Sequence, residues 1–203
     1  MKFYKIYYIT KIMSFFKEIR DIYRYFTNSN RQNVITFYSE MEIYYQYYKG
    51  TIEALLLKSN TIILYITSDD EDQILKKDRT NLLSFYINTL VPLVFPFINT
   101  KILIMTMPEI DKYHIKRSIN DVNHVYMFHA VNSVHLQYKK GAFDNYDTIF
   151  CVGQHHVDEI RKTEALYGLK PKELVSIGYS RLEALEGQYL ALKDSYDSVK
   201  KKL

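Results

Sequence analysis

Apolar residues recur every three or four positions near the amino terminus of the chain. They are Phe3, Ile6, Ile9, Ile12, Met13, Phe16, Ile19, Tyr23 and Phe26. This spacing places them on one face of a helix, with most of the basic residues elsewhere. The pattern therefore predicts an amphipathic helix within residues 1–32. Such a helix either packs on its own domain or lies in the surface of an anionic membrane. The spacing of the apolar residues is the same in both cases and does not distinguish them.

After residue 33 the pattern changes to short apolar runs that alternate with segments typical of helices. Six runs are typical of strands: residues 34–40, 61–69, 101–109, 124–130, 147–153 and 173–178. Residues 44–59 and the segment HHVDEIRKTEALYG are predicted helices, and Gly168 closes the second one. Short buried strands that alternate with helices indicate an α/β fold, in which helices cover both faces of a Rossmann-like parallel sheet. We predict one such domain over residues 33–203.

The longest apolar stretch is LLSFYINTLVPLVFPFI, residues 82–98. It contains two prolines and falls short of the roughly twenty apolar residues that a bilayer core requires. We expect a pair of helices here, either buried or dipping into a membrane, and not a transmembrane span.

Composition and charge narrow the class of protein. A hydrophobic content of 47% is enough for a sizeable core, and the scarcity of glycine and proline excludes collagenous and low-complexity chains. Seven basic and two acidic residues fall within residues 1–32, which leaves the rest of the chain close to neutral. A neutral main domain argues against nucleic-acid binding, because phosphate backbones require a concentrated basic face.

Cysteine usage and the first residues bear on location. Cys151 is the single cysteine, so it cannot form a disulfide within the chain, which favours a reducing compartment. It lies in an apolar run, where a catalytic thiol is not expected. The first thirteen residues, MKFYKIYYITKIM, lack the apolar core and cleavage site of a secretory signal. We expect a cytoplasmic location, with peripheral attachment to the inner face of the cytoplasmic membrane as an alternative.

Polar side chains follow the predicted strands at the point where each strand ends. Because the carboxyl ends of parallel strands meet at one edge of a sheet, these side chains are expected to gather there. Four of the six histidines lie within residues 126–160. The candidate site residues at this edge are His129, Asn132, Ser133, His135, His155, His156, Tyr179 and Arg181.

The types of residue limit the chemistry of this edge. The chain has no G-x-G-x-x-G, P-loop, H-E-x-x-H or C-x-x-C motif, so dinucleotide, P-loop and common zinc chemistry are not supported. His155 and His156 are adjacent, and on a helix they diverge by about 100°, so no metal site is predicted. His129 is either an acid or base near neutral pH or a buried histidine bonded to a backbone carbonyl. Lys116 and Arg117 are either anion ligands or a solvated surface pair.

Four blocks in residues 101–186 follow one another in a characteristic order. They are TMPEIDKYHIKRS, YMFHAVNSVH, GAFDNYDTIFCVGQHHVDEI and GYSRLEAL. They resemble the amino-terminal half of the CDP-glycerol glycerophosphotransferase family, the polymerases and primases of teichoic-acid-type polymers. The resemblance covers about 150 residues from Asn33 onward. It implies one half of a GT-B architecture, in which two Rossmann-like domains enclose the active site.

The resemblance also implies an activity. Family members transfer glycerol phosphate from CDP-glycerol to an acceptor hydroxyl. The resemblance therefore implies transfer of glycerol phosphate, or of a sugar, to a cell-surface polymer, with no cofactor besides the nucleotide-activated donor. His129 corresponds to the histidine that acts as general base in the family, although Phe128 and Ala130 stand where the family has tryptophan and glycine. The base withdraws the proton of the acceptor hydroxyl while CMP leaves. The other edge residues, with Lys116 and Arg117, are the expected substrate contacts.

In the family the carboxyl-terminal domain builds most of the nucleotide site, whereas this sequence ends at KDSYDSVKKKL. We therefore expect the chain alone to be inactive and a second GT-B domain or partner chain to complete the cleft. The alternative is a non-catalytic domain that docks on a membrane or a protein through residues 1–32.

Overall fold

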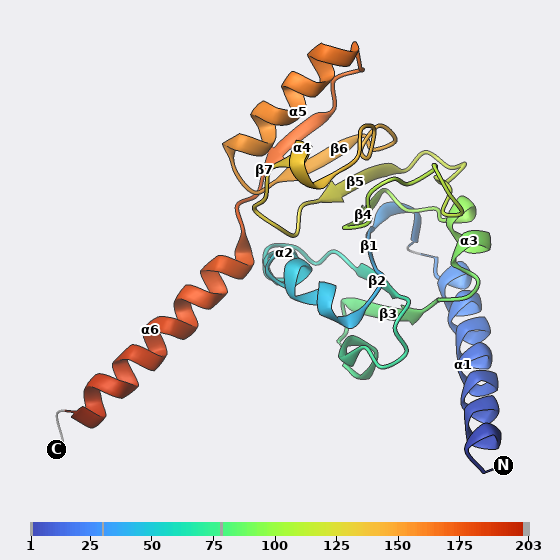
Figure 1. Cartoon of the computed structure of the whole chain (residues 1–203). Helices are drawn as coiled ribbons and strands as arrows, with labels where there is room; N and C mark the ends of the chain where they lie inside the picture. The colour runs from blue at the N-terminus through green and yellow to red at the C-terminus, as the bar shows by residue number, and fades with distance from the viewer. Residues whose placement is uncertain (1, 30, 78, 201–203) are drawn as a thin grey trace.

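The computed structural model describes residues 2–29, 31–77 and 79–200, except for the side chains of residues 2–10, 33 and 194–200. Seven strands in this part of the chain form one parallel sheet, in the order β3-β2-β1-β4-β5-β6-β7 (Figure 1). The strands are β1 (Ile35–Ser39), β2 (Ile63–Thr67), β3 (Leu82–Tyr86), β4 (Ile102–Met105), β5 (Asn123–Met127), β6 (Thr148–Cys151) and β7 (Glu173–Ser176). The predicted α/β class and Rossmann-like parallel sheet are confirmed.

Helices cover both faces of the sheet. On one face α2 (Tyr45–Lys58) buries Tyr48 and Ile52 against Phe37 and Tyr65 of the inner strands. On the other face α5 (Gln154–Tyr167) contributes Ile160 to the larger core cluster. The inner strands are apolar on both sides because neither side meets water, which is why they appear in the sequence as continuous apolar runs.

The predicted end of α5 is confirmed. Gly168 adopts a left-handed conformation, with φ of 61°, and its N–H donates to the carbonyl of Glu164. Only glycine adopts this conformation without steric cost, so the helix ends there.

The prediction of two helices in residues 82–98 is wrong in its first part. Leu82–Tyr86 forms β3, which pairs in parallel with β2 and aligns Phe85 with Ile66. The second part does contain two short helices, α3 (Val91–Val94) and η4 (Phe95–Phe97). An apolar run of this length does not separate a buried strand from a buried helix. Within the described residues no helix has the combination of length and apolar character needed to cross a bilayer.

The amino-terminal helix α1 (Lys2–Thr27) docks on the edge of the sheet through two buried carboxylates and the buried side chain of Tyr25. Glu18 and Asp21 are each only 1% exposed. The carboxylate of Glu18 accepts the backbone N–H groups of Asn88 and Leu90, both at 2.7 Å. Asp21 accepts the N–H of Tyr86 at 3.1 Å. These bonds satisfy backbone donors at the end of β3, so α1 packs on its own domain next to this strand.

Several side chains of the apolar face of α1 point away from the domain, whereas Phe26 at the carboxyl end of this face packs against the main core. The exposed side chains include Ile12 (55%), Phe16 (67%), Ile19 (44%) and Tyr23 (69%). We call these four residues the α1 stripe. The side chains of Phe3, Ile6 and Ile9, which the sequence pattern assigns to the same face, lie outside the described part of the chain.

The carboxyl-terminal helix α6 (Ser180–Lys200) leaves β7 and crosses α2. At the crossing, a Cβ added to Gly50 would lie 2.6 Å from the Cβ of Ser180, so only glycine permits this approach. Figure 1 shows α1 and α6 extending from opposite sides of the sheet. The remaining helices are short: η1 (Arg31–Asn33), η2 (Glu42–Tyr44), η3 (Gln73–Lys76) and α4 (Val134–Gln137).

Candidate functional site

The strand order reverses between β1 and β4, and in open α/β sheets ligands bind outside the carboxyl ends of the strands at such a point. Glu40 follows β1 directly, Thr106 follows β4, and His129 comes two residues after β5. The three neighbouring strands β1, β4 and β5 therefore deliver a carboxyl, a hydroxyl and an imidazole to one edge.

His129 lies half-buried among tyrosine side chains. Its ring centroid is 5.5 Å from those of both Tyr44 and Tyr47. Tyr179 stacks on Tyr47 and donates its hydroxyl hydrogen to the backbone carbonyl of His129 at 3.0 Å. Arg181 lies 5.4 Å over the ring of Tyr47. Nδ1 of His129 is buried and has no hydrogen-bond partner within the described part of the chain. The backbone of His129 is thus held in place, and its imidazole lies half-buried at the carboxyl edge of the sheet.

Burial shifts the pKa values of His129 and Glu40 in opposite directions. It lowers the pKa of His129 and raises the pKa of Glu40. Glu40 in turn acts through space on Tyr44, whose pKa is raised mainly by burial and further by that carboxyl. Both shifts favour neutral forms, and a neutral imidazole can accept a proton. Titratable groups with shifted pKa values are a common mark of functional sites.

His155 and His156 do lie at the carboxyl edge, but the prediction that they diverge is wrong. Their ring centroids are 4.2 Å apart. Nε2 of His155 is 3.1 Å from the carbonyl oxygen of Val131, and Nε2 of His156 is 2.9 Å from that of Asn132. Both residues start α5, where their rings turn back over the loop that follows β5. His156 is fully buried, and burial lowers its pKa. The two histidines therefore fix the backbone of the loop that follows β5.

Ser133 and His135 gather around the carboxylate of Glu159. This carboxylate accepts the Ser133 hydroxyl at 3.0 Å and the backbone N–H groups of Val134 and His135 at 2.6 and 3.2 Å. It also lies 3.0 Å from Nδ1 of His135. Burial would raise the pKa of Glu159, but these hydrogen bonds outweigh it and lower the pKa. The side-chain amide of Asn132 donates to Gln137. The predicted substrate contacts Asn132, Ser133 and His135 therefore already have hydrogen-bond partners within the fold.

The structure does not bring Lys116 and Arg117 to His129. Arg117 pairs with Asp147 at 2.9 Å, just before β6, and Asp147 also accepts the N–H of His124 at the start of β5. Lys116 donates to the carbonyl of Asp111. Both basic residues thus lie toward the amino ends of β5 and β6. The connection from β4 to β5, which contains both residues, has to return to the amino-terminal edge of the sheet before β5 begins. The expectation that Lys116 and Arg117 contact substrate together with the residues of the carboxyl edge is therefore wrong.

Metal and thiol chemistry find no geometric basis in the described residues. No cluster of three or more His, Cys, Asp or Glu side chains within them is arranged to hold a metal ion. Cys151 is buried in the sheet, and burial raises the pKa of its thiol to about 11. The thiol is therefore protonated at neutral pH and is a poor nucleophile.

Sequence reasoning missed Glu40, Tyr44 and Tyr47. Glu40 carried a usable signal, because it is the first charged residue after the apolar run of β1. The tyrosines carried none, because their approach to His129 depends on how α2 and α6 pack across the edge of the sheet.

The chain matches no protein-family model, no curated protein and no solved structure. The sheet, the placement of its side chains and the ordered sequence blocks therefore carry the functional argument.

Proposed function

We propose that this domain is the acceptor-side half of a GT-B transferase. It would move glycerol phosphate, or a sugar, from a nucleotide-activated donor such as CDP-glycerol to a hydroxyl of a cell-surface polymer. The observation that carries the proposal is the half-buried imidazole of His129, which lies among Tyr44, Tyr47 and Tyr179 at the carboxyl edge of a Rossmann-like sheet and is held in its neutral form by burial. The ordered blocks that resemble the glycerophosphotransferase family support the same reaction.

In the proposed step, the neutral imidazole of His129 accepts the proton of the acceptor hydroxyl. The hydroxyl oxygen forms a bond to the donor phosphorus as the bond from phosphorus to CMP breaks, and CMP leaves with the electron pair. Tyr44 and Tyr47 flank the imidazole, and Arg181 supplies positive charge nearby. Most of the rate gain in such a transfer comes from positioning and charge stabilisation. A second Rossmann-like domain or chain would hold the nucleotide.

Two measurements test this proposal. Isothermal titration with a glycerol-phosphate oligomer reports acceptor binding, and CMP release from CDP-glycerol with that oligomer present reports transfer. We expect the wild-type chain to bind the oligomer, and CMP release to need the second domain. Where release occurs, His129→Ala is expected to lower it by about 100-fold or more, because a general base typically contributes a factor of 10² to 10⁴. Oligomer binding should change much less.

The matched control is His114→Ala, because His114 is exposed on a loop remote from these contacts. It should leave both binding and release unchanged. A wild-type chain that neither binds the oligomer nor releases CMP contradicts the proposal. So does a His129→Ala variant that releases CMP at the wild-type rate.

A second candidate function, docking on an anionic membrane, is favoured by the orientation of α1. The α1 stripe is exposed because α1 packs on the domain through Glu18, Asp21 and Tyr25, which lie on another side of the helix. Arg20 and Arg24 lie beside the stripe, each paired with the single carboxylate of Asp21 at 2.9 Å, and their side chains are 61% and 48% exposed. An apolar stripe with basic residues beside it suits a surface of anionic lipid, where each basic residue near the membrane adds about 1 kcal/mol of attraction.

Vesicle sedimentation tests this candidate. The chain should sediment with phosphatidylglycerol vesicles and much less with phosphatidylcholine vesicles. Phe16→Glu and Ile19→Glu should abolish sedimentation, whereas Leu57→Glu should not, although Leu57 is an 87% exposed apolar residue on α2. Equal loss in all three variants, or equal binding to both lipids, argues against membrane docking by α1.

A further inference from the structure

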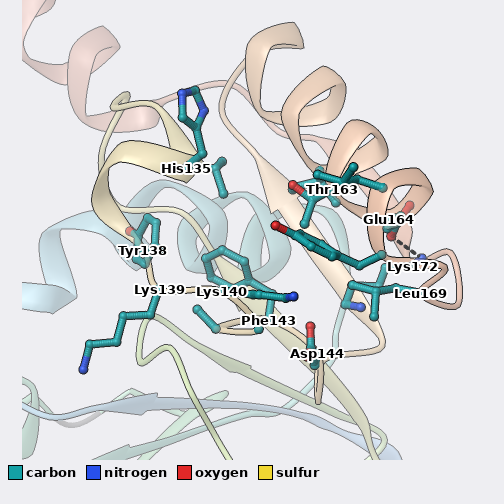
Figure 2. Close-up of a pocket in the computed structure, with 16 residues that line it drawn as sticks. His135, Tyr138, Lys139, Lys140, Phe143, Asp144, Thr163, Glu164, Leu169 and Lys172 are labelled. Carbon is teal, nitrogen blue, oxygen red and sulfur yellow. Dashed lines mark hydrogen bonds between the residues drawn. The ribbon is translucent and has the colours of Figure 1, made fainter.

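A cavity of about 260 Å³ lies between α5 and the segment that connects β5 to β6. Its floor is made by side chains of the main core that are at most 9% exposed: Val134, Ala142, Phe143 and Ile160. Its walls include Tyr138, Leu169 and two partly open residues, Leu166 (74% exposed) and Tyr167 (45%). Figure 2 shows Phe143 and Thr163 pointing toward the cavity from its two sides. A ligand here would cover apolar surface that is otherwise open to water.

The charged residues of the lining leave positive charge in excess. The lining contains three lysines, Lys139, Lys140 and Lys172, and two acidic residues, Asp144 and Glu164. Figure 2 shows Lys140 reaching across the cavity and Lys139 pointing away from it. The ammonium of Lys140 lies 3.6 Å over the ring of Tyr167.

Glu164 does not compensate these lysines. Its carboxylate pairs with Arg161 at 2.6 Å and accepts the backbone N–H of Lys172 at 2.8 Å. It is also only 5% exposed, so its charge is already used within the fold. Among the described residues, the side-chain ammonium groups of Lys140 and Lys172 form no ion pair with a carboxylate.

We infer that this cavity binds a small amphipathic anion. Its apolar body packs on Phe143, Ile160 and Leu169, and its carboxylate or phosphate group contacts Lys140 and Lys172. The volume is slightly below the roughly 300–1,000 Å³ of ordinary ligand pockets, which limits the apolar body to a short chain or a single ring system. The site shares no group with the contacts of His129, so the inference goes beyond the proposed transfer reaction and does not depend on it.

Titration with four probes tests the ligand class. Decanoate and decyl phosphate carry the two possible head groups, decanol has the same chain without charge, and inorganic phosphate has charge without a chain. We expect both anions with the decyl chain to bind, and decanol and phosphate to bind at least about tenfold more weakly, which is 1.4 kcal/mol. Stronger binding by one decyl anion identifies the preferred head group. Backbone amide shifts in residues 138–144 and 160–172 should locate the probe, which separates this site from the α1 stripe.

Variants assign the roles of the lining. Lys140→Met and Lys172→Met keep the apolar stem and remove the charge, and each should weaken decanoate binding by about three- to tenfold. Thr163→Phe should block every decyl probe by filling the cavity. The control Lys162→Met changes an exposed lysine of α5 outside the lining and should have no effect. Urea unfolding checks that each variant is folded.

Equal binding of decanol and decanoate overturns the inference. So does equal binding of inorganic phosphate, equal weakening by Lys162→Met, or unchanged binding in a folded Thr163→Phe variant.

Discussion

The hydroxyl of Tyr179 donates a hydrogen bond to the backbone carbonyl of His129 at 3.0 Å, and this bond joins the end of β7 to the loop that follows β5. The two strands are separated in the sheet by β6. Because α6 begins at the next residue, Ser180, the position of α6 and the position of the imidazole are coupled.

Removing this hydroxyl should therefore loosen the loop. Tyr179→Phe is expected to lower the free energy of unfolding by about 0.5–1.5 kcal/mol, the usual net contribution of one hydrogen bond. It should also move the ring resonances of His129, which a merely local loss of stability would not do. Urea unfolding and NMR check both effects. Tyr189→Phe, at a 64% exposed tyrosine of α6, serves as the control, and equal results for the two variants would contradict the coupling.

The crossing of α6 over α2 predicts a compensating pair of substitutions. Alanine has a higher helix propensity than glycine by about 1 kcal/mol, so Gly50→Ala would stabilise an isolated α2. Here the new Cβ would approach the Cβ of Ser180 to 2.6 Å, and we expect destabilisation instead. Adding Ser180→Gly should restore the stability lost through the clash. A double-mutant cycle of unfolding free energies measures this coupling, and additive effects would show that the helices do not touch there.

The buried carboxylate of Glu18 makes α1 part of the folded domain. Glu18→Ala leaves the N–H groups of Asn88 and Leu90 without their acceptor, and it should lower the free energy of unfolding by about 2–3 kcal/mol. Phe16→Ala on the exposed side of the same helix should change it by no more than about 0.5 kcal/mol. Urea unfolding compares the two variants. The reverse order of effects would mean that α1 packs through its apolar face.

Glu40 is expected to act against stability. Burial raises its pKa, so the charged form is less favoured in the folded chain than in the unfolded chain. At pH 7, Glu40→Gln should therefore raise the Tm, and the gain should shrink as the pH falls and the wild-type carboxyl takes up a proton. Calorimetry at several pH values measures this, with Glu53→Gln on α2 as control. A lower Tm for Glu40→Gln at pH 7 would mean that the carboxylate stabilises the fold.

Six of the seven described strands and the class of fold follow from apolar runs and helix periodicity. The strand β3 does not, because LLSFY and LVPLVFPF form one long apolar stretch that only Asn88 and Thr89 interrupt, and a buried strand in such a stretch looks like a buried helix. Periodicity also identified the two faces of α1 but not which one packs. That choice depends on Glu18 and Asp21 meeting backbone N–H groups some seventy residues away in sequence.

The candidate site was predictable only as far as the topology places residues. His129, His155, His156, Tyr179 and Arg181 lie near the carboxyl edge because parallel strands end there. Their roles differ for reasons that sequence spacing does not contain. His156 is fully buried with Nε2 near a carbonyl oxygen, whereas the ring of His129 is half-buried and contacts Tyr44 and Tyr47.

The most direct test of the central claim is an NMR titration of the His129 ring, with and without a glycerol-phosphate oligomer. The account predicts a pKa below the ordinary value of about 6.5, so that the proton-accepting neutral form predominates at pH 7 and increases as the pH rises. It also predicts that the oligomer shifts the ring resonances of His129 but not those of His114. A His129 ring that titrates at or above the ordinary value and does not respond to the oligomer would contradict it.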